Sequence, residues 1–113
     1  MFGDLGSGKT TFVQGAAAGL GIRGFVTSPS FVIINEYKTQ SGILFFHIDL
    51  YRTENILQIE DLGISELFSR DAVVMIEWAE KARTLLPKKC KKIYFEFISE
   101  NERGINIDEN TGD

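Results

Sequence analysis

Residues 3–10 read Gly3-Asp4-Leu5-Gly6-Ser7-Gly8-Lys9-Thr10, and this stretch decides how the rest of the sequence is interpreted. It fits the pattern G-x-x-x-x-G-K-[ST] at every fixed position. In that pattern the glycines let successive backbone N–H groups surround a phosphate, and the lysine adds a positive charge. The final hydroxyl is placed to bind Mg²⁺. The stretch therefore predicts a phosphate-binding P-loop, although a glycine-rich turn could match the same pattern.

The residues that follow the loop predict alternating helices and strands. Residues 9–20 are expected to form a helix whose positive end points at the bound anion, and Gly19 and Gly21 are expected to end it. Further helices are expected at 54–62, 64–68 and 79–86. Runs rich in β-branched and aromatic residues predict strands at 31–37, 43–51, 72–78, 93–98 and 105–107. The expected fold class is α/β, a P-loop NTPase-like mixed sheet flanked by helices.

The start of the sequence departs from this fold. A P-loop normally follows a buried parallel strand, and here only Met1 and Phe2 precede Gly3. We therefore expect residues 1–113 to form a single P-loop domain whose first strand is largely missing, as in a shortened form of a longer protein. Loss of a central strand should cost several kcal/mol of burial and hydrogen bonding.

Composition excludes several classes of protein. The net charge of −4 argues against bulk electrostatic coating of nucleic acid, so DNA is not expected as a partner. The lone Cys90 fits a reducing, cytoplasmic compartment, and the sequence shows neither a signal peptide nor an apolar run that could span a membrane. The one basic cluster, Lys88-Lys89-Cys90-Lys91-Lys92, fits either a solvated loop or a surface for RNA or an acidic protein.

Two acidic residues could complete a nucleotide site, because each follows an apolar strand. Glu77 ends the run Val73-Val74-Met75-Ile76, and Asp49 ends Phe45-Phe46-His47-Ile48. P-loop proteins commonly place an acid at such a strand end, where it holds Mg²⁺ or orients the attacking water. We expect Thr10 and Glu77 to hold Mg²⁺, with Glu77 or Asp49 orienting the water. Either acid could instead simply solvate a strand end.

Other polar residues near these motifs have two interpretations each. His47 lies in mid-strand, where a core histidine bonded to a neighbour is more common than a catalytic one. Trp78 could line a base or partner site or anchor the sheet edge, and Arg52 could reach a phosphate or pair with a nearby acid. Ser28 and Ser30 flank Pro29 and could sense a phosphate or cap a strand.

Taken together, these motifs resemble one small family. The P-loop is followed in order by Ser28-Pro29-Ser30-Phe31, His47-Ile48-Asp49-Leu50-Tyr51-Arg52, Glu60-Asp61-Leu62-Gly63-Ile64 and Ile76-Glu77-Trp78. The sequence resembles the bacterial TsaE (YjeE) family of ATPases from tRNA threonylcarbamoyladenosine biosynthesis, from Gly3 to about Ile107. It departs from the family pattern at Ser30, where threonine is usual, and in lacking the helix and strand that usually precede the loop.

The resemblance implies a role and a set of site residues. Family members hydrolyse ATP with Mg²⁺ and act on the TsaB–TsaD complex, through which tRNA could be contacted; they do not transfer the threonylcarbamoyl group themselves. By resemblance, residues 3–10 and Thr11 would bind the nucleotide, Thr10 and Glu77 the Mg²⁺, and Glu77 and Asp49 would be the acids needed for hydrolysis. Ser28, Ser30, Tyr51, Arg52 and Trp78 would support the site.

Two other functions remain open from the sequence. The first is a non-catalytic, nucleotide-dependent switch or a degenerate fragment, which the missing strand favours and the intact Lys9, Thr10, Asp49 and Glu77 oppose. The second is a small P-loop kinase, although the sequence has no arginine-rich lid. The preference for adenine or guanine is not set by any motif in the sequence.

Overall fold

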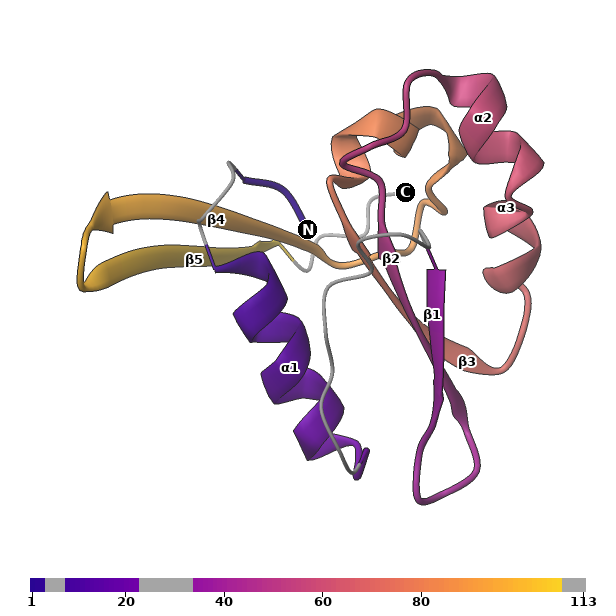
Figure 1. Cartoon of the computed structure of the whole chain (residues 1–113), viewed down its shortest axis with the longest axis horizontal. Helices are drawn as coiled ribbons and strands as arrows, with labels where there is room; N and C mark the ends of the chain where they lie inside the picture. The colour runs from indigo at the N-terminus through magenta and orange to yellow at the C-terminus, as the bar shows by residue number, and fades with distance from the viewer. Residues whose placement is uncertain (4–7, 23–33, 109–113) are drawn as a thin grey trace.

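The computed structural model describes residues 1–3, 8–22 and 34–108 (Figure 1). Its helices are α1 (Lys9–Gly19), α2 (Ile56–Asp61), α3 (Ile64–Leu67) and the 3₁₀ helix η1 (Ala79–Leu85). Its strands are β1 (Ile34–Lys38), β2 (Leu44–Asp49), β3 (Ala72–Glu77), β4 (Lys92–Ser99) and β5 (Glu102–Asp108). The expected elements are therefore present, while the expected connection at 24–30 and residues 31–33 lie outside the described part of the chain.

The strands form two separate sheets. In the first, β2 lies between β1 and β3, antiparallel to β1 and parallel to β3. The second is the antiparallel β4–β5 hairpin, which projects away from the first sheet in Figure 1. Because β2 and β3 run in the same direction, their carboxyl ends meet at one edge, with Asp49 opposite Glu77. This confirms the mixed α/β fold.

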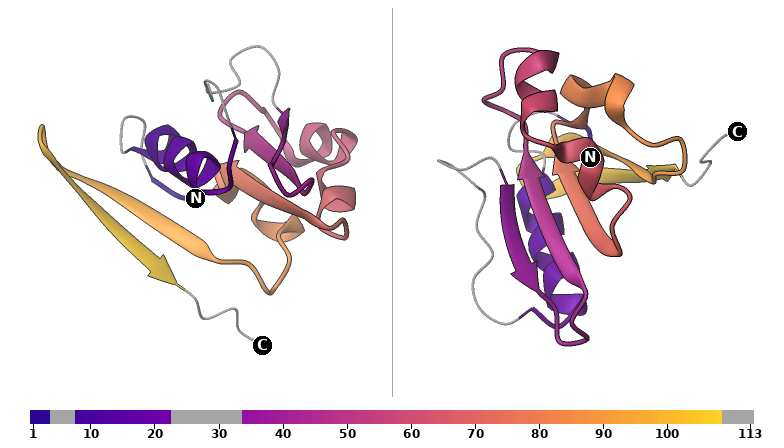
Figure 2. Two further views of the ribbon diagram at one scale, coloured as in Figure 1. Left: turned by 90° about the horizontal axis from the view of Figure 1, so that it is seen from below. Right: turned by 90° about the vertical axis from the view of Figure 1, so that its right-hand side faces the viewer.

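The first sheet has helices on both faces (Figure 2). On one face, α1 buries Val13 and Ala17 against Phe45, and its Phe12 ring meets Phe95 of β4 edge-on at 5.5 Å. The other face is covered by α2, α3 and η1, whose buried residues pack against Ile48 and Leu50 of β2 and the segment after it. The sheet is therefore held between two layers of apolar side chains, which come from distant parts of the sequence.

Met1 and Phe2 join the two sheets, in the position where a strand before the loop was expected. The Met1 ammonium donates a hydrogen bond to the Ile76 carbonyl at 2.7 Å. The Phe2 N–H donates to the Ile93 carbonyl, and the Phe95 N–H donates to the Phe2 carbonyl, both at 2.8 Å. Burial lowers the pKa of the Met1 ammonium from 8.0 to about 6.

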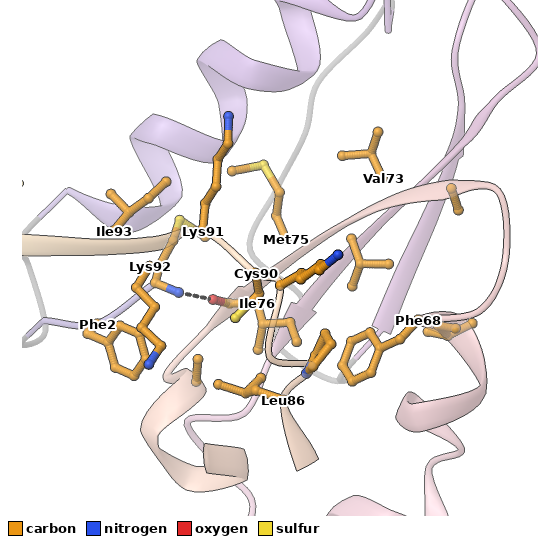
Figure 3. Close-up of a pocket in the computed structure, with 17 residues that line it drawn as sticks. Phe2, Phe68, Val73, Met75, Ile76, Leu86, Cys90, Lys91, Lys92 and Ile93 are labelled. Carbon is orange, nitrogen blue, oxygen red and sulfur yellow. Dashed lines mark hydrogen bonds between the residues drawn. The ribbon is translucent and has the colours of Figure 1, made fainter. Parts of the chain in front are cut away.

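A groove of about 410 Å³ continues from Met1 between β3 and residues 89–93 (Figure 3). Its walls are mainly apolar, with Phe68, Ile76 and Leu86 pointing into it. Because this groove leaves one edge of β3 open, residues 72–75 are only half-buried. The nearly continuous apolar run at 72–76 predicts a strand buried on both faces, and this prediction is wrong except at Ile76 and Glu77.

Two other local expectations are corrected. The spacing of Ile56, Leu57, Ile59 and Leu62 predicts a buried stripe on α2. Leu57 is instead 67% exposed, because a helix of six residues offers a single inward turn, which Ile59 fills. Residues 79–85 form a 3₁₀ helix interrupted at Ala82 instead of a regular α-helix. Within the described residues, no helix has the length and apolar character needed to cross a membrane.

Candidate functional site

The edge where β2 and β3 end also receives the start of α1. The Thr10 hydroxyl, in the first turn of α1, lies 3.0 Å from Oε1 and 3.1 Å from Oε2 of Glu77, and it donates to this carboxylate. The two residues are far apart in the sequence and meet because α1 crosses the face of the sheet above β3. A hydroxyl and a carboxylate in contact at a helix N-terminus are suitable oxygen ligands for Mg²⁺.

Glu77 has a second partner in His47. The Nε2 atom of His47 lies 2.5 Å from Oε2 of Glu77. His47 is fully buried and Glu77 is 3% exposed. His47 and Glu77 come from neighbouring parallel strands, two positions apart in register, and both face α1. The expectation of a core histidine bonded to a neighbour is therefore confirmed, and its partner is the predicted metal-binding acid.

Lys9 is held close to the site by two contacts. Its Nζ donates a hydrogen bond to the Gly3 carbonyl and lies 3.6 Å from the centre of the Trp78 ring. A lysine ammonium over an indole face is attracted by the negative charge of the ring face. The side chain is 4% exposed, so its charge lies in a partly desolvated site at the start of α1.

The backbone around the site has unusual conformations at two positions. Gly8 precedes α1 with a φ of 105°, which a residue with a side chain adopts only with strain. Trp78 has a φ of 60°, so the chain turns sharply after Glu77. This turn places the indole beside the Tyr51 ring at 5.1 Å and beneath Lys9.

Asp49 lies directly opposite Glu77 but has a different environment. Its Oδ1 accepts a hydrogen bond of 2.9 Å from the Tyr51 N–H, and the side chain is half-buried. The segment after it is fixed by Lys81, whose Nζ donates to the carbonyls of Tyr51 at 2.6 Å and Thr53 at 3.0 Å. Asp49 therefore keeps more access to solvent than Glu77, at the same edge of the sheet.

The structure brings some of the predicted site residues together and separates others. Lys9, Thr10, Trp78 and Glu77 form one cluster, with Asp49 and Tyr51 beside it. Arg52 lies exposed in the turn after β2, and Thr11 is exposed on α1. Within the described part of the chain, the structure does not bring Arg52 into contact with Thr10 or Glu77. Asp4, Leu5, Gly6, Ser7, Ser28 and Ser30 lie outside the described residues.

Sequence reasoning missed two contributors, His47 as the partner of Glu77 and Lys81 as the support of the segment after β2. For His47 a signal existed, since positions 47 and 49 share one face of a strand and Glu77 ends the next one. Among residues 1–3, 8–22 and 34–108, no group of three His, Cys, Asp or Glu side chains could hold a metal.

Comparison with known proteins gives consistent matches. A family model described as "Threonylcarbamoyl adenosine biosynthesis protein TsaE" matches residues 1–105. The "tRNA threonylcarbamoyladenosine biosynthesis protein TsaE" of Bacillus subtilis is 44% identical over 106 residues, which are 93% of this chain and 65% of that protein. The protein of the same name from Aquifex aeolicus is 39% identical, over 93% of this chain and 71% of its own length.

A solved structure agrees with these relatives. The crystal structure of Bacillus subtilis YdiB matches with a TM-score of 0.72 and 37% identity, over 91% of this chain and 61% of that chain. The chain thus spans 65% of the B. subtilis relative and 54% of the Haemophilus influenzae relative.

Proposed function

Because the chain belongs to the TsaE family of tRNA threonylcarbamoyladenosine biosynthesis proteins, we propose that it binds and hydrolyses ATP in support of this tRNA modification. The observation that carries the proposal is the contact of Thr10 with Glu77 beside Lys9, at the joined ends of two parallel strands. P-loop hydrolases need a phosphate-binding lysine, a hydroxyl and a strand-end acid at one place.

In this proposal each residue has a distinct task. Lys9 and the backbone at the start of α1 bind the β- and γ-phosphates of ATP. The donor set fits Mg²⁺, since Thr10 and Glu77 offer a hydroxyl and a carboxylate within 3.1 Å of one another. When bound, Mg²⁺ would neutralise part of the charge that develops on the phosphates.

We assign the attacking water to Asp49. Glu77 is almost completely buried and already shares its carboxylate with Thr10 and His47, whereas Asp49 is half-buried at the same edge. An acid with access to solvent can accept a proton from water, and such a step typically contributes about 10²- to 10⁴-fold to the rate. Trp78 and Tyr51 hold Lys9 and the strand end in place through their ring contacts.

The partners in this proposal are TsaB and TsaD, and tRNA would be contacted through their complex. Lys89 and Lys91 are exposed and line the groove beside β3, whose lining does not include Glu77, so we do not place them in the nucleotide site. The proposed link between ATP hydrolysis and these partners rests on the family's role in tRNA modification.

The test measures phosphate release from ATP with and without purified TsaB–TsaD. Glu77→Gln keeps the shape of the side chain and should still bind ATP, but its hydrolysis should fall by at least about 100-fold because the charge is lost. Glu36→Gln, on the exposed side of β1, is the matched control and should hydrolyse ATP normally. Unchanged hydrolysis by Glu77→Gln would overturn the assignment.

The same assay separates the alternatives. Hydrolysis that requires TsaB–TsaD supports the proposed function. Phosphate transfer to a small acceptor would instead indicate a kinase, and nucleotide binding without turnover under any of these conditions would indicate a switch.

A further inference from the structure

The contact between His47 and Glu77 is unusual for its surroundings. His47 lies within the apolar run of β2, between Phe46 and Ile48, and all three side chains are buried. An apolar residue would fill this position without a desolvated polar group. A buried imidazole therefore needs a hydrogen-bond partner, and Nε2 of His47 has one in Oε2 of Glu77 at 2.5 Å.

The other ring nitrogen of His47 has a different environment from Nε2. Among the described residues, Nδ1 is buried and has no hydrogen-bond partner. A carboxylate oxygen can only accept, so Nε2 donates to Glu77. An unsatisfied buried atom of this kind is rare and costs stability. The single hydrogen bond to Glu77 is thus the one polar contact that this buried ring makes within the described structure.

We propose that His47 is a positioning residue, which fixes the carboxylate of Glu77 so that it faces Thr10 at the nucleotide edge. The inference deepens the proposed function and rests on it. Glu77 has two kinds of partner, Thr10 on the nucleotide side and His47 on the side of β2. Thr10 and Glu77 would hold Mg²⁺, and the hydrogen bond from His47 would keep the Glu77 carboxylate oriented toward it. Residues that orient a metal ligand in this way typically contribute about 10- to 100-fold to metal affinity or activity.

Three substitutions separate the hydrogen bond from the packing. His47→Leu fills the position and removes the donor. His47→Gln keeps an N–H donor at about the reach of Nε2, and His47→Asn keeps a polar side chain that is too short to reach Glu77. Met75→Leu is the packing control, because Met75 lies opposite His47 on β3.

The first measurement is ATP hydrolysis with TsaB–TsaD at varied Mg²⁺ concentration. His47→Leu should raise the half-saturating Mg²⁺ concentration and lower kcat, each by about 10-fold or more, with KM for ATP at saturating Mg²⁺ changed less than about threefold. His47→Gln should recover most of this loss and His47→Asn should not. Met75→Leu should match the wild type. If His47→Leu does not fold, the comparison of Gln with Asn carries the test.

Two outcomes would overturn the inference while leaving the proposed function intact. One is wild-type Mg²⁺ dependence and kcat in His47→Leu, and the other is a His47→Gln variant no better than His47→Asn. If the wild type itself neither binds nor hydrolyses ATP, the proposed function fails. The inference is then decided by thermal unfolding without nucleotide. Shifts of the midpoint that are not additive between His47→Leu and Glu77→Gln support the positioning contact, and additive shifts refute it.

Discussion

Replacement of Thr10 by valine tests whether the hydroxyl stabilises the site before any ligand arrives. Thr10 and valine have nearly the same shape and similar helix propensity, so the substitution removes the hydrogen bond to Glu77 with little change in packing. The bond joins a neutral hydroxyl to a carboxylate that is 3% exposed. Hydrogen bonds to charged groups contribute about 1.5–3 kcal/mol, and the half-buried position of Thr10 favours a value of about 2 kcal/mol.

This energy converts to a measurable change in melting temperature. A chain of 113 residues has an unfolding entropy of about 0.24 kcal/mol/K, so a loss of about 2 kcal/mol lowers the midpoint by about 8 °C. The assay is thermal unfolding followed by circular dichroism, with a chelator present and no nucleotide added. Thr10→Ser is the control, because it keeps the hydroxyl at the same place and should lose much less. A Thr10→Val midpoint within about 2 °C of the wild type, or an equal loss in Thr10→Ser, would refute the reasoning.

Two further predictions concern stability at other positions. The pKa of the Met1 ammonium falls to about 6 on folding, so the unfolded chain binds more protons than the folded chain between pH 6 and 8. The free energy of unfolding should therefore rise by about 2 kcal/mol as the pH is raised across this range. Urea titrations at both pH values check this against an N-terminally acetylated chain, and an equal rise in that chain would contradict it. The side-chain oxygen of Asn55 accepts a hydrogen bond of 2.9 Å from the Gln58 N–H and caps α2. Asn55→Ala removes this acceptor and should lower the free energy of unfolding in urea by about 1 kcal/mol. Asn55→Asp retains an acceptor and should lower it less.

The parts of the fold that the sequence predicted well are those in which local pattern and burial agree. The apolar run before Glu77 indicated a strand, and β3 ends at that residue. The run before Asp49 likewise forms β2. Both strands end in an acid. In a parallel arrangement the carboxyl ends of the two strands lie at one edge of the sheet, so the two acids meet there.

The remaining features depend on contacts between distant residues, which a local pattern does not contain. The short distance between Thr10 and Glu77 depends on the path of α1 across the sheet. Leu57 is exposed because only a small part of α2 packs against the core. The partner of His47 becomes evident only when β2 and β3 are set in register.

The stacking of Lys9 on Trp78 has an experimental consequence. Trp78 is the single tryptophan of the chain, and the lysine ammonium lies 3.6 Å from its ring centre. Indole emission depends on the electric field across the ring, so the fluorescence of this protein reports where one charged group lies. A phosphate that draws Lys9 off the ring changes the emission without any added dye. The chain therefore contains its own optical probe, and under the proposed function rapid mixing would follow the arrival and departure of a nucleotide in real time.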